Sequence, residues 1–138
     1  MPYKGNSSYL YAAFATPETM VKNAQEVLEK VEYDTMIGIG LSGTLVVPLI
    51  ARAMGKNFAI VRKPNDSNHR ERAVEGYVGE SWIFVDDFVS SGATLERVKA
   101  EIKNLQAGQP YGWDAFETKY IGTYQYARGN FIADGGYF

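Results

Sequence analysis

The stretch between residues 82 and 94 constrains the fold of this chain more than any other. It opens with four apolar residues, 82–85, a run that is typical of a strand buried on both faces of a sheet. Two carboxylates, Asp86 and Asp87, stand at the end of that strand, and the small residues 90–94 follow. Apolar residues at helical spacing come next: Leu95, Val98, Ile102 and Leu105. The stretch therefore predicts a strand, an acid pair, a loop and a helix, in that order.

The small residues between the acid pair and the helix have the composition of a phosphate-binding loop. Backbone N–H groups can approach an anion closely there, and the N-terminus of the helix adds unpaired donors and a partial positive charge. The predicted phosphate-binding residues are Ser90, Ser91, Gly92, Ala93 and Thr94. The acids would serve vicinal hydroxyls or a metal-bridged diphosphate, so the stretch predicts a phosphorylated sugar across the carboxyl ends of a parallel sheet.

Residues 85–94 resemble the phosphoribosyl-diphosphate signature of the type I phosphoribosyltransferases. That signature has an apolar strand, two acids, two apolar residues, a variable residue and then Thr-Gly-x-Thr. This chain has Ser91 in place of the first threonine, which keeps the hydroxyl group. The resemblance implies catalytic and metal-binding roles for Asp86 and Asp87, which would contact the ribose hydroxyls or a Mg²⁺ ion held mostly by the substrate. The alternative is an ordinary strand, turn and helix with solvated acids and a serine cap.

A second unit of strand, small residues and helix lies upstream. Residues 34–39 predict a buried strand, residues 40–44 a loop, and residues 44–54 a helix that is apolar on nearly every side. We expect Pro48 in or near the first turn of that helix and Gly55 at its end. By resemblance, this loop binds diphosphate through Leu41, Ser42 and Gly43. The alternative is a tight turn in which glycine serves only the backbone geometry.

A basic pair, Arg62 and Lys63, follows the next predicted strand at 57–61. Together with Pro64 it resembles the segment after the second core strand in adenine and orotate phosphoribosyltransferases, where a basic pair approaches the diphosphate. Residues 65–80 are polar and lack a sustained period, so we expect a long loop that acts as a lid. A solvated surface loop is the alternative.

The two ends of the chain are predicted to contribute short segments. An irregular lead with an edge strand near 9–14 precedes a helix that begins at Thr16 and Pro17 and ends near 31–33. The last predicted strand covers 119–126, and a short tail follows.

By resemblance, the lead and the tail form a hood over the base, which is reduced here. Tyr124 and Tyr126 are candidates for stacking on a nucleobase. The alternative is that these aromatic residues cover a sheet edge or a dimer interface.

The composition limits the classes of function. A length of 138 residues with 46% apolar residues fits one domain, 1–138, with a real core. A net charge of −2 indicates no nucleic-acid partner. With no cysteine and one histidine, the sequence favours neither a thiolate site nor structural zinc. No apolar run approaches the roughly 20 residues of a membrane span, and no secretory signal is visible, so we expect a cytoplasmic protein without a membrane partner.

The order of the elements predicts an α/β fold: a mainly parallel sheet with helices on both faces, a Rossmann-like core and a reduced hood. The resemblance implies transfer of the phosphoribosyl group of phosphoribosyl diphosphate to a nitrogenous base, with release of diphosphate. The expected partners are phosphoribosyl diphosphate, a nucleobase or nucleotide, and a second copy of the chain in a homodimer. The main alternative is a non-catalytic regulatory protein on the same fold that binds a nucleotide or phosphoribosyl diphosphate.

Overall fold

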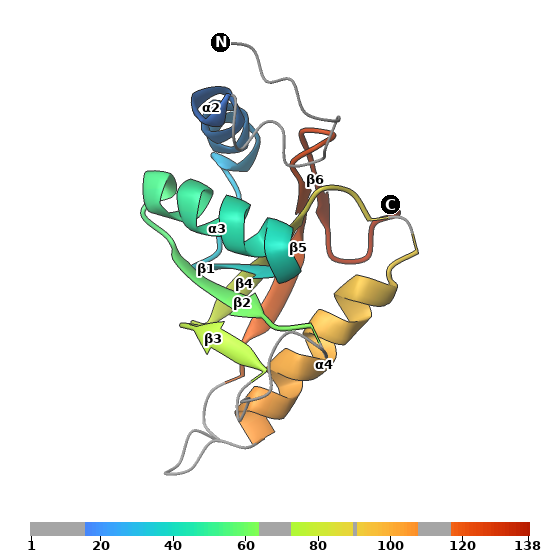
Figure 1. Ribbon diagram of the computed structural model, residues 1–138. Helices are drawn as coiled ribbons and strands as arrows, with labels where there is room; N and C mark the ends of the chain where they lie inside the picture. Colours follow the sequence, from blue (N-terminus) through green and yellow to red (C-terminus); the bar gives the residue numbers. More distant parts are fainter. Residues whose placement is uncertain (1–15, 64–72, 90, 108–116) are drawn as a thin grey trace.

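A six-stranded sheet with helices on both faces forms the body of the described part of the protein (Figure 1). The computed structural model describes residues 16–63, 73–89, 91–107 and 117–138. The elements in chain order are α2 (Pro17–Leu28), β1 (Thr35–Ile39), α3 (Gly40–Met54), β2 (Asn57–Val61), β3 (Val74–Gly76), β4 (Ser81–Asp86), α4 (Ala93–Ala107), β5 (Lys119–Gln125) and β6 (Asn130–Ala133).

The strand order in the sheet is β3-β2-β1-β4-β5-β6. The central strands are parallel, because β1 pairs with both β2 and β4, and β4 pairs with β5. The two outer strands, β3 and β6, run antiparallel to their neighbours. The predicted α/β fold with a mainly parallel sheet is therefore confirmed, and the carboxyl ends of four strands meet at one edge.

Two hydrophobic clusters lie on opposite faces of the sheet. One joins α2 and α3 to the sheet through residues such as Leu28, Val47 and Ile83. The other joins α4 to the opposite face through Val98, Ile102 and Phe84. Figure 1 shows α2 and α3 on one side of the sheet and α4 on the other. The alternation of inward-pointing residues along β4 supplies both clusters, which is why its sequence is apolar throughout.

The helix α3 begins earlier than the sequence predicts. Residues 40–44 were expected to form a loop, but the helix starts at Gly40, directly after β1. Gly40 has a φ of +68°, and the hydroxyl of Thr44 donates to the Gly40 carbonyl over 2.8 Å. Pro48 consequently lies inside the helix rather than in its first turn. Gly55 ends the helix in the left-handed conformation, as predicted, and its N–H bonds to Ala51 and Arg52 carbonyls.

Two further boundaries differ from the prediction. The first helix ends at Leu28 instead of near 31–33, and the Thr16 side chain before it makes no capping hydrogen bond. The expected loop 65–80 contains β3, which pairs with β2, so this part of it is a strand of the sheet and not a loop. The short tail contains β6, which forms a hairpin with β5. Residues 9–14, 64–72 and Ser90 lie outside the described residues. None of the described helices is long and apolar enough to cross a membrane.

Candidate active site

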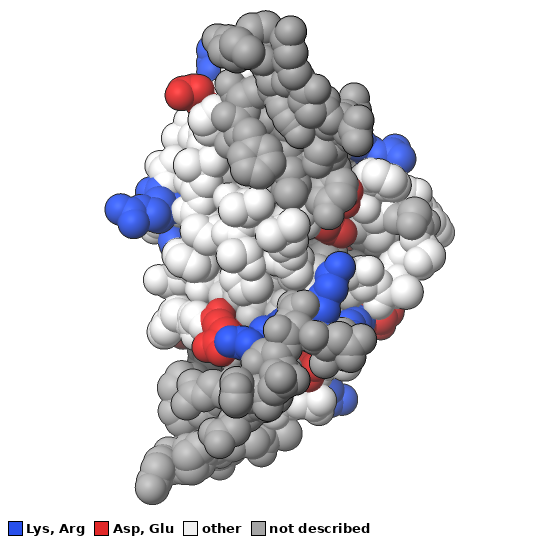
Figure 2. Space-filling model, in the orientation of Figure 1, with Lys and Arg blue, Asp and Glu red and all other residues white. Residues whose placement is uncertain are grey.

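Four segments of the chain converge at the carboxyl edge of the parallel strands. The edge is formed where β1 passes into α3 at Gly40, where β2 ends before Lys63, where β4 ends at Asp86, and where β5 ends at Gln125. Figure 2 shows a broad uncharged face over α3, with basic and acidic side chains lying close together at its lower border. Every motif that the sequence assigned to phosphoribosyl diphosphate follows one of these strand ends.

The acid pair stands where β4 leaves the sheet. Asp86 is the last residue of β4, and Asp87 accepts a hydrogen bond from the N–H of Phe88 through Oδ1, over 2.7 Å. Burial is the main cause that raises the pKa of Asp86 from its ordinary 3.8 to about 6, and the neighbouring charge of Asp87 contributes to this rise. The charge of Lys63 acts in the opposite direction. A nearby cation therefore stabilises the ionised form of the Asp86 side chain.

The segment after the acid pair forms an open cap on α4. The Gly92 carbonyl accepts the N–H of Glu96 over 2.9 Å, and the hydroxyl of Ser91 accepts the N–H of Ala93 over 3.3 Å. Gly92 has a φ of +83°, a conformation that favours glycine, and a Cβ atom added there would meet nothing within 4 Å. Ser91, Ala93 and Thr94 are all exposed. The predicted phosphate-binding residues therefore surround open space at the helix N-terminus, with Ser90 outside the described residues.

The predicted diphosphate-binding residues divide into two groups. Lys63 extends over the start of α3, because a Cβ atom added to Gly40 would lie 2.6 Å from the Lys63 Cε atom. The same side chain lowers the pKa of Asp86, so Lys63 connects the first and second motifs. Arg62 instead pairs with Glu75 on β3, with 3.0 Å between the nearest nitrogen and oxygen atoms. The structure thus brings Lys63, and not the side chain of Arg62, to the acid pair.

Some residues at the start of α3 pack against β1, and others are exposed. Gly43 is buried, and a Cβ atom added there would lie 2.8 Å from the carbonyl carbon of Gly38 on β1. This close approach explains why the helix can lie so near the strand. Leu41 is 63% exposed and Ser42 is partly exposed. Because this segment is helical, its N–H groups can point toward a ligand only in the first turn.

The acid pair fits the oxygen-rich, mostly substrate-held Mg²⁺ that the resemblance implies. Two adjacent carboxylates, one of them desolvated, supply hard oxygen ligands and negative charge. Within the described residues, no three Asp, Glu, His or Cys side chains come together as a metal site. Asp86 and Asp87 could therefore supply part of the coordination of an ion, and the ligand would have to supply the remainder.

The two candidate base-binding tyrosines pack against the core. Tyr124 is fully buried on β5, in the hydrophobic cluster under α2 and α3, and Tyr126 packs against the same cluster. Burial raises the pKa of the Tyr124 hydroxyl to about 12. A ring without exposed surface cannot stack on a base in this conformation. The structure therefore gives Tyr124 a packing role, which is nearer to the alternative stated for these residues.

The sequence analysis missed two polar side chains at this edge. Gln125 is 1% exposed and accepts the N–H of Val89 over 2.7 Å, directly after the acid pair. Arg97 on α4 donates to the carbonyl of Arg62 over 3.3 Å. The only available signal was a polar residue at the end of a predicted strand for Gln125, and a basic residue in the second turn of the helix for Arg97.

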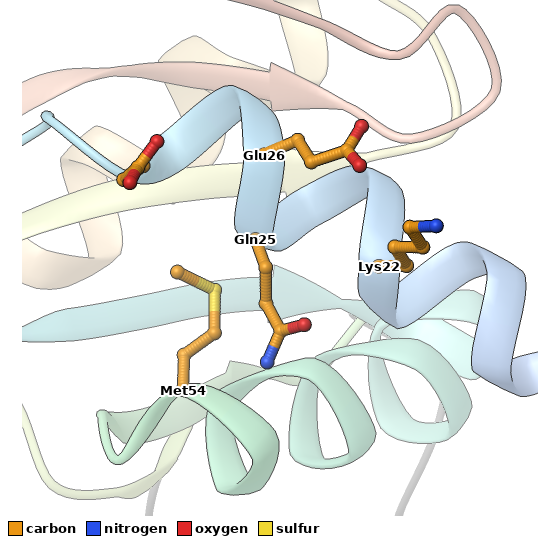
Figure 3. A pocket seen from close by; sticks show the side chains of 5 residues that line it. Lys22, Gln25, Glu26 and Met54 are labelled. Atoms are coloured by element: carbon orange, nitrogen blue, oxygen red, sulfur yellow. The ribbon is translucent and has the colours of Figure 1, made fainter.

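Two pockets lie away from the acid pair. One of about 420 Å³ lies between α2 and the end of α3, where Gln25 and Met54 point into the same gap (Figure 3). It lies at the C-terminal end of α3, far along the helix from Gly40. The other, of about 530 Å³, is bordered by Ser91 and Gly92 on one side and by Tyr120 and the segment after β6 on the other. Only the second touches a predicted site residue.

Curated relatives of known name include regulators and an enzyme. The transcriptional regulator GfcR of Methanococcoides burtonii is 32% identical over 112 residues, covering 75% of this chain and 54% of the regulator. The orotate phosphoribosyltransferase of Staphylothermus marinus is 30% identical over 79 residues, covering 56% of this chain and 39% of the enzyme. The chain thus spans about half or less of the length of these relatives. No model of a protein family matches the chain.

Solved structures with a similar fold include phosphoribosyltransferases. The Mycobacterium tuberculosis orotate phosphoribosyltransferase in complex with phosphoribosyl diphosphate has a TM-score of 0.59 at 19% identity, over 84% of this chain and 63% of that enzyme. The Saccharomyces cerevisiae adenine phosphoribosyltransferase has a TM-score of 0.51 at 18% identity, over 82% of this chain and 71% of that enzyme. This chain therefore has the type I phosphoribosyltransferase fold, and the resemblance carried by residues 85–94 is confirmed at the level of the fold.

Proposed function

We propose that this protein binds phosphoribosyl diphosphate at the carboxyl edge of the sheet and transfers its phosphoribosyl group to a nitrogenous base. The observation that carries the proposal is the position of Lys63. Its side chain extends over Gly40, and its positive charge lowers the pKa of Asp86. A cation that lies over a helix start and influences the ionisation of Asp86 suits a ligand with both phosphate groups and hydroxyls. The open cap at Gly92 lies beyond the acid pair on the same chain segment.

Each part of the ligand has a matching group in this arrangement. The N-terminus of α4, with the hydroxyls of Ser91 and Thr94, holds the 5′-phosphate. Asp86 and Asp87 accept hydrogen bonds from the ribose hydroxyls. Lys63 and the first turn of α3 stabilise the diphosphate. This division follows the order of the motifs along the sheet edge.

In the reaction, the bond between ribose C1 and the diphosphate oxygen breaks and a bond from C1 to a base nitrogen forms. The proton on that nitrogen passes to solvent or to the departing diphosphate. Positive charge develops on the ribose while negative charge develops on the departing diphosphate. The ammonium group of Lys63 stabilises that negative charge, and the carboxylate of Asp86 lies on the side of the ribose. The protein contributes chiefly by holding the two reactants in position. Mg²⁺ held by the diphosphate and by Asp86 or Asp87 would supply further charge neutralisation.

A second candidate is a regulatory protein that binds the same ligand without turning it over. The sequence similarity to GfcR regulators favours it, since the aligned region covers three quarters of this chain. The same phosphate cap and acid pair would then report the presence of a phosphoribosyl compound. The orotate phosphoribosyltransferase relative favours the catalytic candidate.

The two candidates are separated by measuring binding and turnover on the same preparation. Calorimetry with Mg²⁺ and phosphoribosyl diphosphate measures affinity, and incubation with a panel of purine and pyrimidine bases measures diphosphate release. Binding with base-dependent release supports the transferase. Binding without release for any base supports the regulator. Absence of binding in the wild-type protein, with the fold intact by circular dichroism, would reject both.

A further inference from the structure

The hairpin of β5 and β6 holds residues 86–89, the site segment, through its backbone and through one buried side chain, Gln125. We propose that Gln125 is a positioning residue that fixes the backbone at Val89, which lies between the acid pair and the phosphate cap. Its effect on ligand affinity rests on the proposed function. Its effect on the conformation of the segment does not.

Both ends of the Gln125 amide form hydrogen bonds within the described structure. It lies opposite Asp86 in the register of β4 and β5 and is 1% exposed. Its Oε1 atom accepts the N–H of Val89 over 2.7 Å, and its Nε2 atom donates to Oδ1 of Asn130 over 3.0 Å. Because the two ends of the amide have different partners, its orientation is fixed.

The backbone of the same hairpin holds the acid pair. The N–H of Tyr126 donates to the Asp86 carbonyl over 2.9 Å, and the N–H of Ala127 donates to the Asp87 carbonyl over 3.0 Å. Together with the Gln125 side chain, the hairpin thus holds three residues of the site segment.

Val89 is the point at which this support reaches the phosphate cap. Its side chain is 6% exposed and belongs to the cluster under α4, while its N–H is held by Gln125. Only Ser90 separates it from Ser91, the first described residue of the cap. Loss of the Gln125 bond would leave a buried N–H without its acceptor, and the segment would have to move to reach water.

A buried glutamine could also serve stability alone, and Thr35 provides a matched control. Thr35 is fully buried and polar, and it lies at the amino end of β1, at the opposite edge of the sheet. Its hydroxyl donates to Oδ1 of Asp34 over 2.6 Å and accepts the N–H of Gly79 over 3.0 Å. Thr35→Val therefore removes a comparable pair of buried hydrogen bonds away from the site.

The test compares Gln125→Leu, Asn130→Ala and Thr35→Val by amide hydrogen exchange and by calorimetry with Mg²⁺ and phosphoribosyl diphosphate. For Gln125→Leu we expect exchange at Val89 to be at least about tenfold faster and affinity about tenfold lower, as for loss of one buried hydrogen bond. Asn130→Ala, which is milder because Asn130 is exposed, should give a smaller change in the same direction. Thr35→Val should lose stability with affinity unchanged.

Two results would overturn the proposal. One is unchanged Val89 exchange in Gln125→Leu, or in Asn130→Ala if the first variant does not fold. The other is an equal, small effect of Gln125→Leu and Thr35→Val on affinity. If the wild-type protein binds no phosphoribosyl diphosphate, the proposed function fails, and the exchange at Val89 still decides whether Gln125 positions the segment.

Discussion

Glycine occurs near the start of the helix that follows each of the buried strands β1 and β4, but Gly43 and Gly92 meet different surroundings. After β1, Gly43 packs directly against Gly38, and the helix starts without a loop. After β4, Gly92 faces open space, and a short segment separates the strand from α4. Similar composition therefore produces a packed junction in one place and an open cap in the other. We infer that the second region carries most of the ligand contacts and that the first contributes mainly the platform beneath Lys63.

The largest expected effect comes from removing the charges of the second region. The double variant Asp86→Asn, Asp87→Asn should lower affinity for magnesium phosphoribosyl diphosphate about 100-fold or more, since two charge-assisted contacts of about 1.5–3 kcal/mol each are lost. Calorimetry measures this directly. The fold should persist, because removing a desolvated carboxylate relieves an unfavourable burial.

Glu75→Gln provides the control for this charge change. Glu75 pairs with Arg62 on the β2–β3 hairpin and is not at the acid pair. Its neutralisation should leave affinity within about threefold, as expected for an exposed ion pair. Equal affinity in the wild type and the double variant would remove the assignment of Asp86 and Asp87.

Alanine at the two glycines tests the comparison itself. Gly43→Ala places a methyl group against the Gly38 backbone, so the free energy of unfolding should fall by about 1–3 kcal/mol. Gly92→Ala should cost about 1–2 kcal/mol because of its positive φ, and should also reduce ligand affinity about tenfold, since the methyl group enters the open cap.

Denaturant unfolding and calorimetry on both glycine variants separate the two roles. We expect Gly43→Ala to leave the affinity of the folded protein near the wild-type value. If Gly43→Ala weakens binding as strongly as Gly92→Ala, the two junctions contribute equally to ligand affinity and the comparison breaks.

The basic pair should show a smaller but asymmetric effect. Lys63→Ala is expected to reduce affinity about tenfold, as for one charge-assisted contact. Arg62→Ala should change affinity less than about threefold, because its side chain is directed to Glu75 at the rim. Titration with phosphoribosyl diphosphate and with ribose 5-phosphate shows whether Lys63 acts on the diphosphate. A loss of equal size for both ligands would contradict that placement.

The order of the core elements could be predicted from the sequence because each has a strong local signal. The apolar run of β4 and the spacing in α4 reflect burial on both faces of the sheet and on one face of the helix. The acid pair at the strand end follows from the same pattern. These features depend on the local order of residues alone.

The remaining features depend on contacts between distant segments. The helix α3 can start directly after β1 because Gly43 packs closely against Gly38. In the sequence alone, a run of small residues is equally compatible with a loop. The hairpin pairings of β3 and β6 are set by their neighbours, and both strands are short. The role of Gln125 arises only when β5 lies beside β4. Burial of Tyr124 likewise depends on where α2 and α3 pack.

In the second region, the free energy of unfolding and the ligand affinity should change with pH in opposite directions. Because the pKa of Asp86 rises from 3.8 in the unfolded chain to about 6 in the folded one, the folded protein holds more protons between these values. The free energy of unfolding should therefore fall as pH rises through that window and then become constant. Affinity for the magnesium complex should rise over the same window, as the carboxyl group ionises.

Asp87→Asn sharpens this measurement. Removing the neighbouring charge lowers the pKa of Asp86, so both changes should move to lower pH. Between pH 3.8 and about 6, denaturant unfolding measures the change in stability and calorimetry measures the change in affinity. A midpoint that does not move in Asp87→Asn would show that the charge of Asp87 does not contribute to the raised pKa of Asp86.

The smallest expected effect concerns Tyr124, which lies on the face of the sheet that α3 covers. Its hydroxyl has no hydrogen-bond partner within the part of the chain that the structure describes, and it lies in the core under α3. Tyr124→Phe should therefore change the free energy of unfolding by less than about 1 kcal/mol, toward greater stability, and leave base and ligand affinity unchanged. Tyr120→Phe is the control, because it removes a 2.6 Å hydrogen bond with Thr123 and should cost about 1 kcal/mol. If Tyr124→Phe loses more stability than Tyr120→Phe, the Tyr124 hydroxyl has a hydrogen-bond partner in the folded protein. If Tyr124→Phe lowers the affinity for a base, Tyr124 belongs to the base-binding site.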